Sequence, residues 1–203
     1  MTGEGQTDVI DDAQRHTAVV VLDCQEGVAE RVFASDDDRR AFAASVVRLL
    51  DLAAQRAWSV VRVHVEFRPG HPEIPASNAY FAGVKQAQRL EAGTPAVAIM
   101  AELASRIEIA PLVVKRRIGA MTGTELEQIL RGLGAERVIL AGLITRGAVL
   151  STACLAADLD YRVAVAEDAC FDPDDEVHRI LMRDVISMRA EVLTVDQLAG
   201  VST

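Results

Sequence analysis

The sequence contains few aromatic side chains, few cysteines and less positive than negative charge. Of its 203 residues, 4% are aromatic and three are cysteines, and the formal net charge is -9. Nucleic-acid surfaces and anionic membranes attract concentrated positive charge, so this balance argues against both as partners. No uninterrupted apolar run approaches the ~18 residues that a membrane-spanning helix needs. The first residues are polar, unlike a signal peptide, which predicts a cytoplasmic protein.

The cysteines match neither a disulfide framework nor a metal-binding knuckle, because Cys24, Cys154 and Cys170 are an odd number at wide spacing. They are therefore predicted to be buried thiols in a reducing compartment. Two histidines and a glutamate lie near the end of one apolar run, at His64, Glu66 and His71. No further clustered ligand completes a zinc site, so we predict no metal and no cofactor.

Apolar runs alternate with helix-forming segments along most of the chain, and these runs predict strands at 17–22, 58–66, 111–114, 138–141, 162–166 and 191–195. Such alternation is typical of a six-stranded, mostly parallel sheet with helices on both faces, a three-layer α/β/α sandwich in the α/β class. The expected strand order is 3-2-1-4-5-6. Residues 17–203 are predicted to form a single domain, preceded by a flexible arm at residues 1–16.

Polar residues follow three of the predicted strands. Asp23 comes after the first strand, Lys115 after the third, and a short loop from Leu143 to Gly147 after the fourth. Open α/β sheets bind ligands at the carboxyl ends of their strands, so we expect these residues near one another. Burial there can raise the pKa of Asp23. On spacing alone, Asp23 could equally cap a turn, and Lys115 could belong to a basic surface patch.

The stretch from Glu136 to Cys170 resembles the isochorismatase-like cysteine hydrolases. In that family, a strand ending in Ala-Gly precedes a short loop, a nucleophilic cysteine and a helix carrying Ser-Thr-Ala, which here is Ser151 to Ala153. The resemblance covers roughly residues 17–196. It places the family's essential aspartate at Asp23 and its lysine at Lys115. The position of the nucleophile is Ala148, so the chain is identified as a member that lacks this cysteine.

The resemblance also implies roles for the loop. In the amidase members an oxyanion is bound by backbone N–H groups, which would here be those of Ile144 and Ala148, and the Leu143-Ile144 peptide is commonly cis. Gln25 matches the glutamine that follows the family's aspartate, and we count it among the substrate-binding candidates. A methyl group cannot attack a carbonyl, so Ala148 excludes thioester chemistry for this chain. Cys154 does not replace it, because the intervening helix turns it away.

Three hypotheses for function remain open. Isochorismatases proper also lack the cysteine and cleave a vinyl ether, which implies Asp23 as the general acid and Lys115 as the group that tunes it. Their substrate carries carboxylates, for which Arg146, Arg68 and the Arg116-Arg117 pair are candidate partners. Alternatively, the chain is a non-catalytic binder of a small molecule. The third hypothesis is a small-amide or carbamoyl amidohydrolase whose nucleophile has been replaced by alanine.

Residues 67–95 form a long irregular excursion that contains four of the six prolines. Loops of this length in compact domains often act as lids or as subunit contacts. Because the segment is semi-apolar and needs a surface to pack against, we predict a homo-oligomer, most simply a dimer.

Overall fold

This computed structural model describes residues 16–200. Its centre is a six-stranded sheet in the order β3-β2-β1-β4-β5-β6, in which every neighbouring pair is parallel. The predicted fold class and strand order are therefore confirmed. The strands are β1 (Thr17–Leu22), β2 (Ser59–Val65), β3 (Leu112–Lys115), β4 (Arg137–Leu143), β5 (Arg162–Phe171) and β6 (Glu191–Leu193). Of the arm predicted at residues 1–16, only His16 lies within the described residues.

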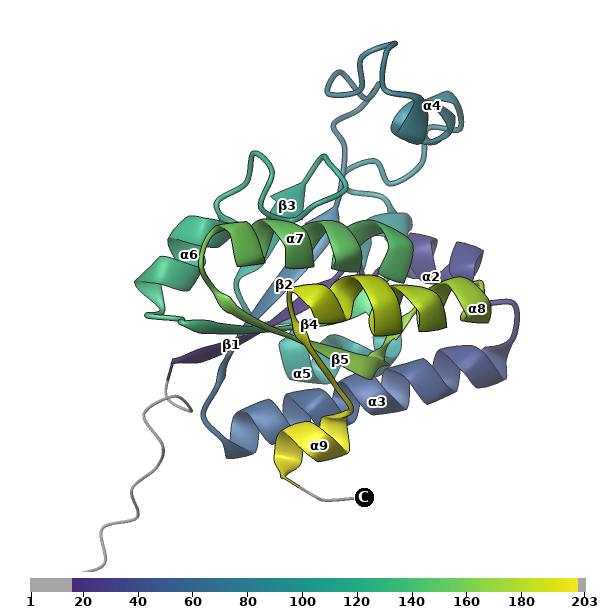
Figure 1. Ribbon diagram of the computed structural model, residues 1–203. Coiled ribbons are helices and arrows are strands. Elements are labelled where there is room, and N and C mark those ends of the chain that lie inside the picture. The colour runs from purple at the N-terminus through teal and green to yellow at the C-terminus, as the bar shows by residue number, and fades with distance from the viewer. Residues whose placement is uncertain (1–15, 201–203) are drawn as a thin grey trace, which may run out of the picture.

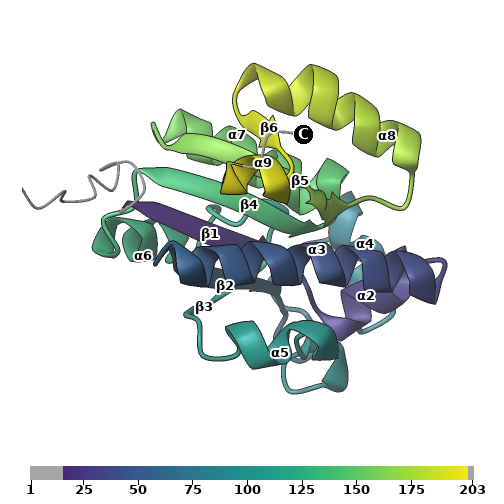
Figure 2. The same cartoon turned by 90° about the horizontal axis from the view of Figure 1, so that it is seen from below.

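Helices cover both faces of the sheet (Figures 1 and 2). One face carries α3 (Asp36–Gln55), α5 (Ala101–Ile107) and α9 (Val195–Ala199). The other carries α6 (Leu126–Gly132), α7 (Leu150–Asp158) and the chain from α8 (Asp175–Ile180) through two short turns, η3 (Leu181–Val185) and η4 (Ile186–Met188). The remaining helical segments are α2 (Glu26–Val32), α4 (Ala79–Gln86), η1 (Pro95–Val97) and the π-helical turn η2 (Thr145–Val149).

The central strand β1 contributes to the core on both sides. Val19 and Val21 pack in the cluster beneath α3, whereas Val20 and Leu22 pack in the cluster beneath α6 and α7. All four side chains are at most 1% exposed. Successive residues of a strand point to opposite faces, so an unbroken apolar run is what a strand buried on both faces requires. This burial fixes the position of the residue that follows, Asp23.

A local irregularity brings β4 close to β1 at the end of the sheet. The pairing of β4 with β5 shifts register between Leu140 and Gly142. Gly142 has φ +132°, and a Cβ there would lie 2.1 Å from the carbonyl oxygen of Leu22. Only glycine fits this position. Past the shift, β5 continues to Phe171, five residues beyond the strand end predicted at 166.

Two helices begin later than their sequences predict. The Asp172-Pro173 pair predicts a helix capped by Asp172, but Asp174 is the N-cap of α8 and accepts a hydrogen bond from the backbone N–H of Val177 at 3.1 Å. The spacing of Thr122 and Glu125 predicts a capping box, which is not formed, since Glu125 is the N-cap of α6 and its side chain makes no capping hydrogen bond. Asp172 instead has a different partner, described below.

The excursion at residues 67–95 rises from the sandwich and carries α4 (Figure 1). Its two ends are joined by backbone hydrogen bonds, in which Phe67 donates to Leu90 and Ala92 donates to Phe67. The Nε2 atom of the His71 ring also donates to the carbonyl oxygen of Arg89 at 2.7 Å. The excursion is therefore a closed, internally bonded loop. The homo-oligomer expected from it stays a prediction.

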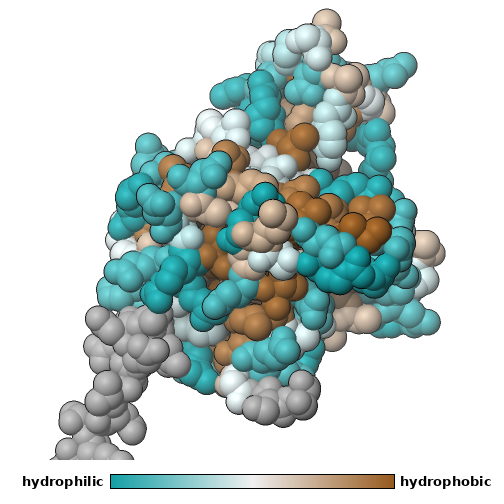
Figure 3. All heavy atoms as spheres, in the orientation of Figure 1, coloured by the Kyte–Doolittle hydropathy of each residue, from teal (hydrophilic) through white to brown (hydrophobic). Residues whose placement is uncertain are grey.

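On the face drawn in Figure 3, hydrophilic side chains cover most of the outer surface, and hydrophobic ones show in strips between them. None of the helices within residues 16–200 is both long enough and apolar enough to span a membrane.

Candidate active site

The centre of the candidate site is a buried ion pair between two strands that are not neighbours. Asp23 directly follows β1, and Lys115 ends β3, with β2 lying between them. The Lys115 side chain reaches across so that its Nζ atom lies 2.9 Å from Oδ2 of Asp23. Exposure is 3% for the lysine side chain and 8% for the aspartate. The proximity expected from the two strand ends is therefore present in the structure.

Asp23 is held in an uncommon backbone conformation and has a free oxygen. Its φ is +55°, and its backbone N–H donates to the carbonyl oxygen of Val63 at 2.8 Å. Its Oδ1 atom is buried and has no hydrogen-bond partner among the described residues. Burial raises the pKa of this carboxyl group above its ordinary value, and the Lys115 ammonium offsets part of that rise. Asp23 can thus stay protonated at a higher pH than an exposed aspartate can.

The loop after β4 lies beside this pair. The Leu143-Ile144 peptide is cis, as the resemblance implied. The next five residues form η2, in which the N–H of Val149 donates to the carbonyl oxygen of Ile144 at 3.4 Å, and α7 follows directly. Ala148 is 5% exposed and is the fourth residue of η2. The expected oxyanion donors, the N–H groups of Ile144 and Ala148, stay predictions.

Above the ion pair lies a cavity of about 210 Å³. Asp23, Lys115, Ile144 and Ala148 are among its lining residues, and most of the others lie on α2 and α4. None of the lining residues within the described chain is a cysteine. The cavity therefore brings together a carboxyl group of raised pKa, an ammonium group and the methyl group of Ala148.

Residues 17–197 match the isochorismatase domain family. The chain belongs to this family. An isochorismatase family protein of Escherichia coli O157:H7, YecD, is 35% identical over 86 residues, which cover 42% of this chain and 46% of that protein. A probable inactive nicotinamidase of Arabidopsis thaliana, At3g16190, is 24% identical and covers 90% of this chain and 94% of its own. The crystal structure of a cysteine hydrolase from Pseudomonas syringae superimposes with a TM-score of 0.81 at 21% identity, covering 91% of each chain.

Three of the expected substrate-binding residues of this isochorismatase domain do not line the cavity. The Gln25 side chain is fully buried and forms two hydrogen bonds with the last residue of β2. It accepts from the N–H of Val65 at 2.8 Å and donates to the carbonyl oxygen of Val65 at 3.1 Å. Arg68 is exposed and paired with Glu73 at 2.6 Å. Arg146 is bound to Asp172, so its charge is already neutralised. Each of these side chains has a partner within the protein.

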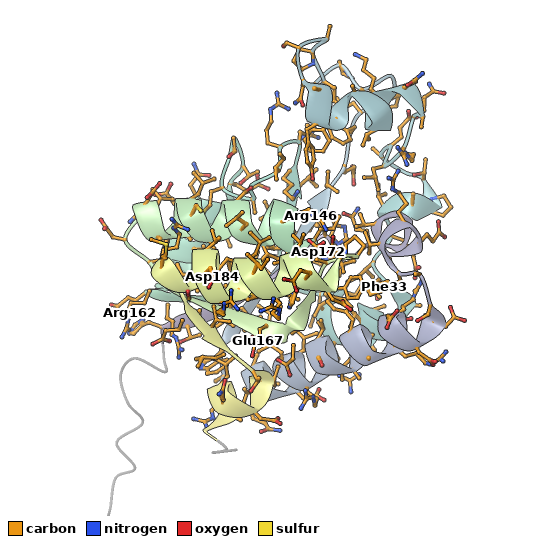
Figure 4. All side chains as sticks on the ribbon, turned by 45° about the vertical axis from the view of Figure 1, so that its right-hand side comes forward. Phe33, Arg146, Arg162, Glu167, Asp172 and Asp184 are labelled. Atoms are coloured by element: carbon orange, nitrogen blue, oxygen red, sulfur yellow. The ribbon has the colours of Figure 1, made fainter. Side chains whose placement is uncertain are left out.

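Asp172 fixes the loop that carries Ile144 and Ala148. Its side chain is fully buried, and it accepts from both the backbone N–H of Arg146, at 3.0 Å, and the Nε atom of that arginine, at 2.8 Å. Figure 4 shows Arg146 and Asp172 next to each other at this end of the domain. The Thr145 hydroxyl adds a contact of 2.8 Å to Nδ1 of His178 on α8. The loop is thereby tied to the chain that follows β5.

Replacing the Asp172 carboxylate, which accepts these hydrogen bonds, should therefore destabilise the loop after β4. Asp172→Asn is expected to lower the free energy of unfolding by about 1.5–3 kcal/mol, because it weakens hydrogen bonds that the charged Arg146 donates to a buried carboxylate. Urea unfolding measures the loss. Asp174→Asn is the matched control and should change stability by less than about 0.5 kcal/mol, since asparagine caps a helix as well as aspartate does. Equal losses in both variants would contradict the assignment of Asp172.

The thiols and histidines have surroundings that suit structural roles. Burial raises the pKa of both the Cys24 and the Cys170 thiols. Cys154 is only partly buried, which corrects the expectation of three buried cysteines. Burial also lowers the pKa of His64 to about 4. Within residues 16–200, no group of three or more histidine, cysteine or acidic side chains is placed to hold a metal ion.

Two basic residues that line the cavity were missed from the sequence. Arg31 lies on α2 and Arg89 follows α4, and neither helix was predicted. Asn78 could have indicated the start of α4, because asparagine is a common N-cap residue. Its side chain caps the helix by accepting from the N–H of Phe81 at 3.2 Å. Nothing in the sequence distinguishes Arg31 or Arg89 from the other arginines of the chain.

Proposed function

We propose that this isochorismatase domain hydrolyses a small molecule of the vinyl-ether type by general acid catalysis, without a covalent enzyme intermediate. The observation that carries the proposal is the buried Asp23 carboxyl group, whose pKa is raised and whose Oδ1 atom has no partner among the described residues. Ala148 beside it offers no nucleophilic atom. A proton donor without a nucleophile suits a reaction that begins with protonation of the substrate.

Asp23 is protonated both at the start and at the end of the proposed reaction. The carboxyl group donates it to the alkene carbon, the C=C electron pair forms the new C–H bond, and the ether oxygen stabilises the resulting cation. Water then adds to the cation and returns a proton to the Asp23 carboxylate. The hemiketal breaks its C–O bond and releases a ketone and an alcohol. Lys115 stabilises the carboxylate while the proton is on the substrate.

A non-catalytic binding protein is the second candidate, and one observation favours it. The Arabidopsis thaliana relative, which matches over 90% of this chain, is described as a probable inactive nicotinamidase. A binding protein would keep the cavity and the fold while turning over none of the substrates offered to it.

Turnover before and after treatment with iodoacetamide tests the proposal. The purified protein is offered a panel of small vinyl ethers and small amides, and product is followed by mass spectrometry. We expect hydrolysis of at least one vinyl ether and no loss of rate after alkylation, because the proposed chemistry uses no thiol. Inactivation traced to alkylated Cys24 or Cys154 would overturn the mechanism, and turnover of nothing on the panel would favour the binding protein.

Ala148→Cys provides the positive control for that experiment. A thiol at position 148 of η2, beside Asp23 and Lys115, is expected to have a lowered pKa and to react with iodoacetamide faster than the three natural cysteines. Alkylation at position 148 is read by peptide mass spectrometry.

A further inference from the structure

Glu73 attaches the long excursion to the segment directly after β3, residues 116–119. Its Oε1 atom lies 3.0 Å from Nε of Arg116, and its side chain is 12% exposed. Its backbone carbonyl oxygen accepts from Nη1 of Arg117 at 3.2 Å. Arg68, on the excursion itself, adds a hydrogen bond of 2.6 Å to the same Oε1 atom. Glu73 therefore holds the segment after β3 through both its charge and its backbone.

The two arginines at this attachment are those that the sequence offered as partners for a substrate carboxylate. Neither Arg116 nor Arg117 is among the residues that line the cavity in the described chain. Both are bound to Glu73 instead. Their position directly after Lys115 therefore calls for a role other than contact with the substrate.

Arg117 also holds the ammonium group of Lys115. The Nζ atom of Lys115 donates to the carbonyl oxygen of Arg117 at 3.1 Å and lies 2.9 Å from Oδ2 of Asp23. The lysine side chain is 3% exposed, so water has little access to replace an acceptor that moves away. A displacement of the Arg117 carbonyl oxygen would leave the ammonium less firmly placed beside Asp23.

The same attachment supports a wall of the cavity. Ile74 follows Glu73 and is 1% exposed, and its carbonyl oxygen accepts from Nζ of Lys85 in α4 at 2.9 Å. Tyr80 and Phe81, also in α4, line the cavity. The position of α4 over the cavity and the position of Lys115 below it thus depend on one region of contact.

Lys115 is the charged group whose position decides the pKa of Asp23. Burial raises that pKa, and the Lys115 ammonium offsets part of the rise. Burial also raises the pKa of the Cys24 thiol and of the Tyr80 hydroxyl, and the Asp23 carboxylate adds to both rises. These two groups therefore stay uncharged while Asp23 titrates. The other charged side chains that line the cavity keep their charge in every variant below, and they are Arg31 and Arg89.

We propose that Glu73 is a positioning residue, which couples the seating of the excursion to the placement of the Lys115 ammonium beside Asp23. Arg117 transmits the effect, because its side chain bonds to Glu73 and its carbonyl oxygen bonds to Lys115. The proposal rests on the proposed function only in taking the Asp23 proton as the one used in catalysis. When the contact with Glu73 is broken, Asp23 holds this proton more tightly.

Titration of Asp23 in the variant Glu73→Gln tests the proposal without any turnover. The carboxyl-carbon resonance of Asp23, assigned as the one missing from Asp23→Asn, is followed against pH by NMR. Glu73→Gln keeps the size of the side chain and removes its charge. We expect Asp23 to bind its proton about three-fold to ten-fold more tightly in this variant, because a less firmly placed ammonium stabilises the carboxylate less.

The direction of this change separates the proposed route from a direct effect of charge. Removing the negative charge of Glu73 acts directly to weaken proton binding at Asp23, since it leaves two arginines uncompensated. The route through Lys115 strengthens proton binding instead. Weaker proton binding in Glu73→Gln would therefore overturn the proposal.

Hydrogen–deuterium exchange on the same samples measures how firmly the excursion is seated. The amides of α4 should exchange about two-fold to five-fold faster in Glu73→Gln, because an ion pair that holds this segment is lost. Glu91→Gln is the matched control on the same excursion. Its Oε2 atom accepts from the N–H of Gly70 at 3.4 Å, and no ion pair within residues 16–200 joins it to Arg116 or Arg117. This control should change the exchange and the titration by less than about twofold.

Arg117→Lys tests the transmitting residue while keeping its charge. The Nη1 atom of Arg117 donates to the carbonyl oxygens of both Glu73 and Arg116, and an ammonium group lacks the fixed geometry of the guanidinium. This variant should strengthen proton binding at Asp23 in the same direction as Glu73→Gln. The double variant should show less than the sum of the two effects, because both act through the same segment. Circular dichroism and thermal melting check that each variant is folded.

The proposal is overturned if Asp23 titrates in Glu73→Gln as in the wild type, if α4 exchanges as in the wild type, or if Glu91→Gln gives equal changes. Its failure is distinct from failure of the proposed function. A chain that hydrolyses nothing but shows the shifted titration keeps the positioning role and loses the chemistry. A chain that hydrolyses a vinyl ether without the shift keeps the chemistry and loses the positioning role. In an active chain, the fall of kcat/KM should move to higher pH in Glu73→Gln.

Discussion

Asp23→Asn should lower kcat by ~10² to 10⁴, because it keeps the shape of the side chain and removes the transferable proton. Asp23 is the one acidic side chain that lines the cavity in the described part of the chain, so we expect no neighbouring acid to take over its role. The measurement is steady-state turnover of the vinyl ether that the wild type hydrolyses, with circular dichroism confirming that both proteins are folded. A variant that keeps more than about a tenth of the wild-type kcat would exclude Asp23 as the acid.

The same experiment has a pH signature. A general acid must be protonated to act, and burial raises the pKa of Asp23 above its ordinary value. The wild-type kcat/KM should therefore be highest below this raised pKa and should fall as the pH rises through it. In Asp23→Asn this fall should disappear from the residual rate. A wild-type profile that rises with pH instead would indicate a catalytic base.

Lys115→Met should lower the free energy of unfolding by about 3–5 kcal/mol at pH 8, because it leaves the buried Asp23 carboxylate without its counter-charge. Without Lys115, the folded-state pKa of Asp23 rises further above its unfolded value of about 4. The native state then binds a proton that the unfolded state releases, so the loss grows as pH rises from the unfolded toward the folded pKa. Urea unfolding at pH 5 and pH 8 should show the smaller loss at pH 5.

Two further variants control for the change from lysine to methionine. Lys85 is exposed and its Nζ atom donates to the carbonyl oxygen of Ile74 at 2.9 Å, so Lys85→Met should cost less than about 1 kcal/mol. The double variant Asp23→Asn with Lys115→Met removes both charges and should recover most of the loss. If the double variant is as unstable as Lys115→Met alone, the lysine acts through packing and not through its charge.

The sheet could be predicted because its determinants are local and repetitive. Thr17–Leu22 is an unbroken run of β-branched and apolar residues, and the segment Asp36–Gln55 has a continuous apolar stripe. The end of β5 was missed because Glu167 and Asp168 interrupt its apolar run. Asp168 is kept in the strand by distant partners, accepting from Arg48 at 2.8 Å and from the N–H of Val195 at 2.9 Å. Such long-range partners leave no pattern in the sequence.

The site was predictable only where a strand end determines the position. Asp23 and Lys115 each stand at the end of a buried strand, so the parallel sheet alone brings them to one edge. Arg146 was assigned to the substrate because its partner Asp172 is 26 residues away in sequence. Arg31 and Arg89 depend on helices of seven and eight residues, α2 and α4, which are too short to show a periodic pattern.

The link that Asp23 and Lys115 form across three strands bears on how activity is lost in such a domain. Removing either partner leaves the other as an unpaired charge in the interior, which destabilises the fold. A descendant that no longer needs catalysis would therefore still be selected to keep both residues. A relative can then keep this pair because the pair stabilises the fold, so its presence says little about whether that relative turns over a substrate. Position 148 is under no such constraint, because its methyl group takes part in no ion pair. The residue at position 148 can therefore be exchanged while the Asp23–Lys115 pair remains unaltered.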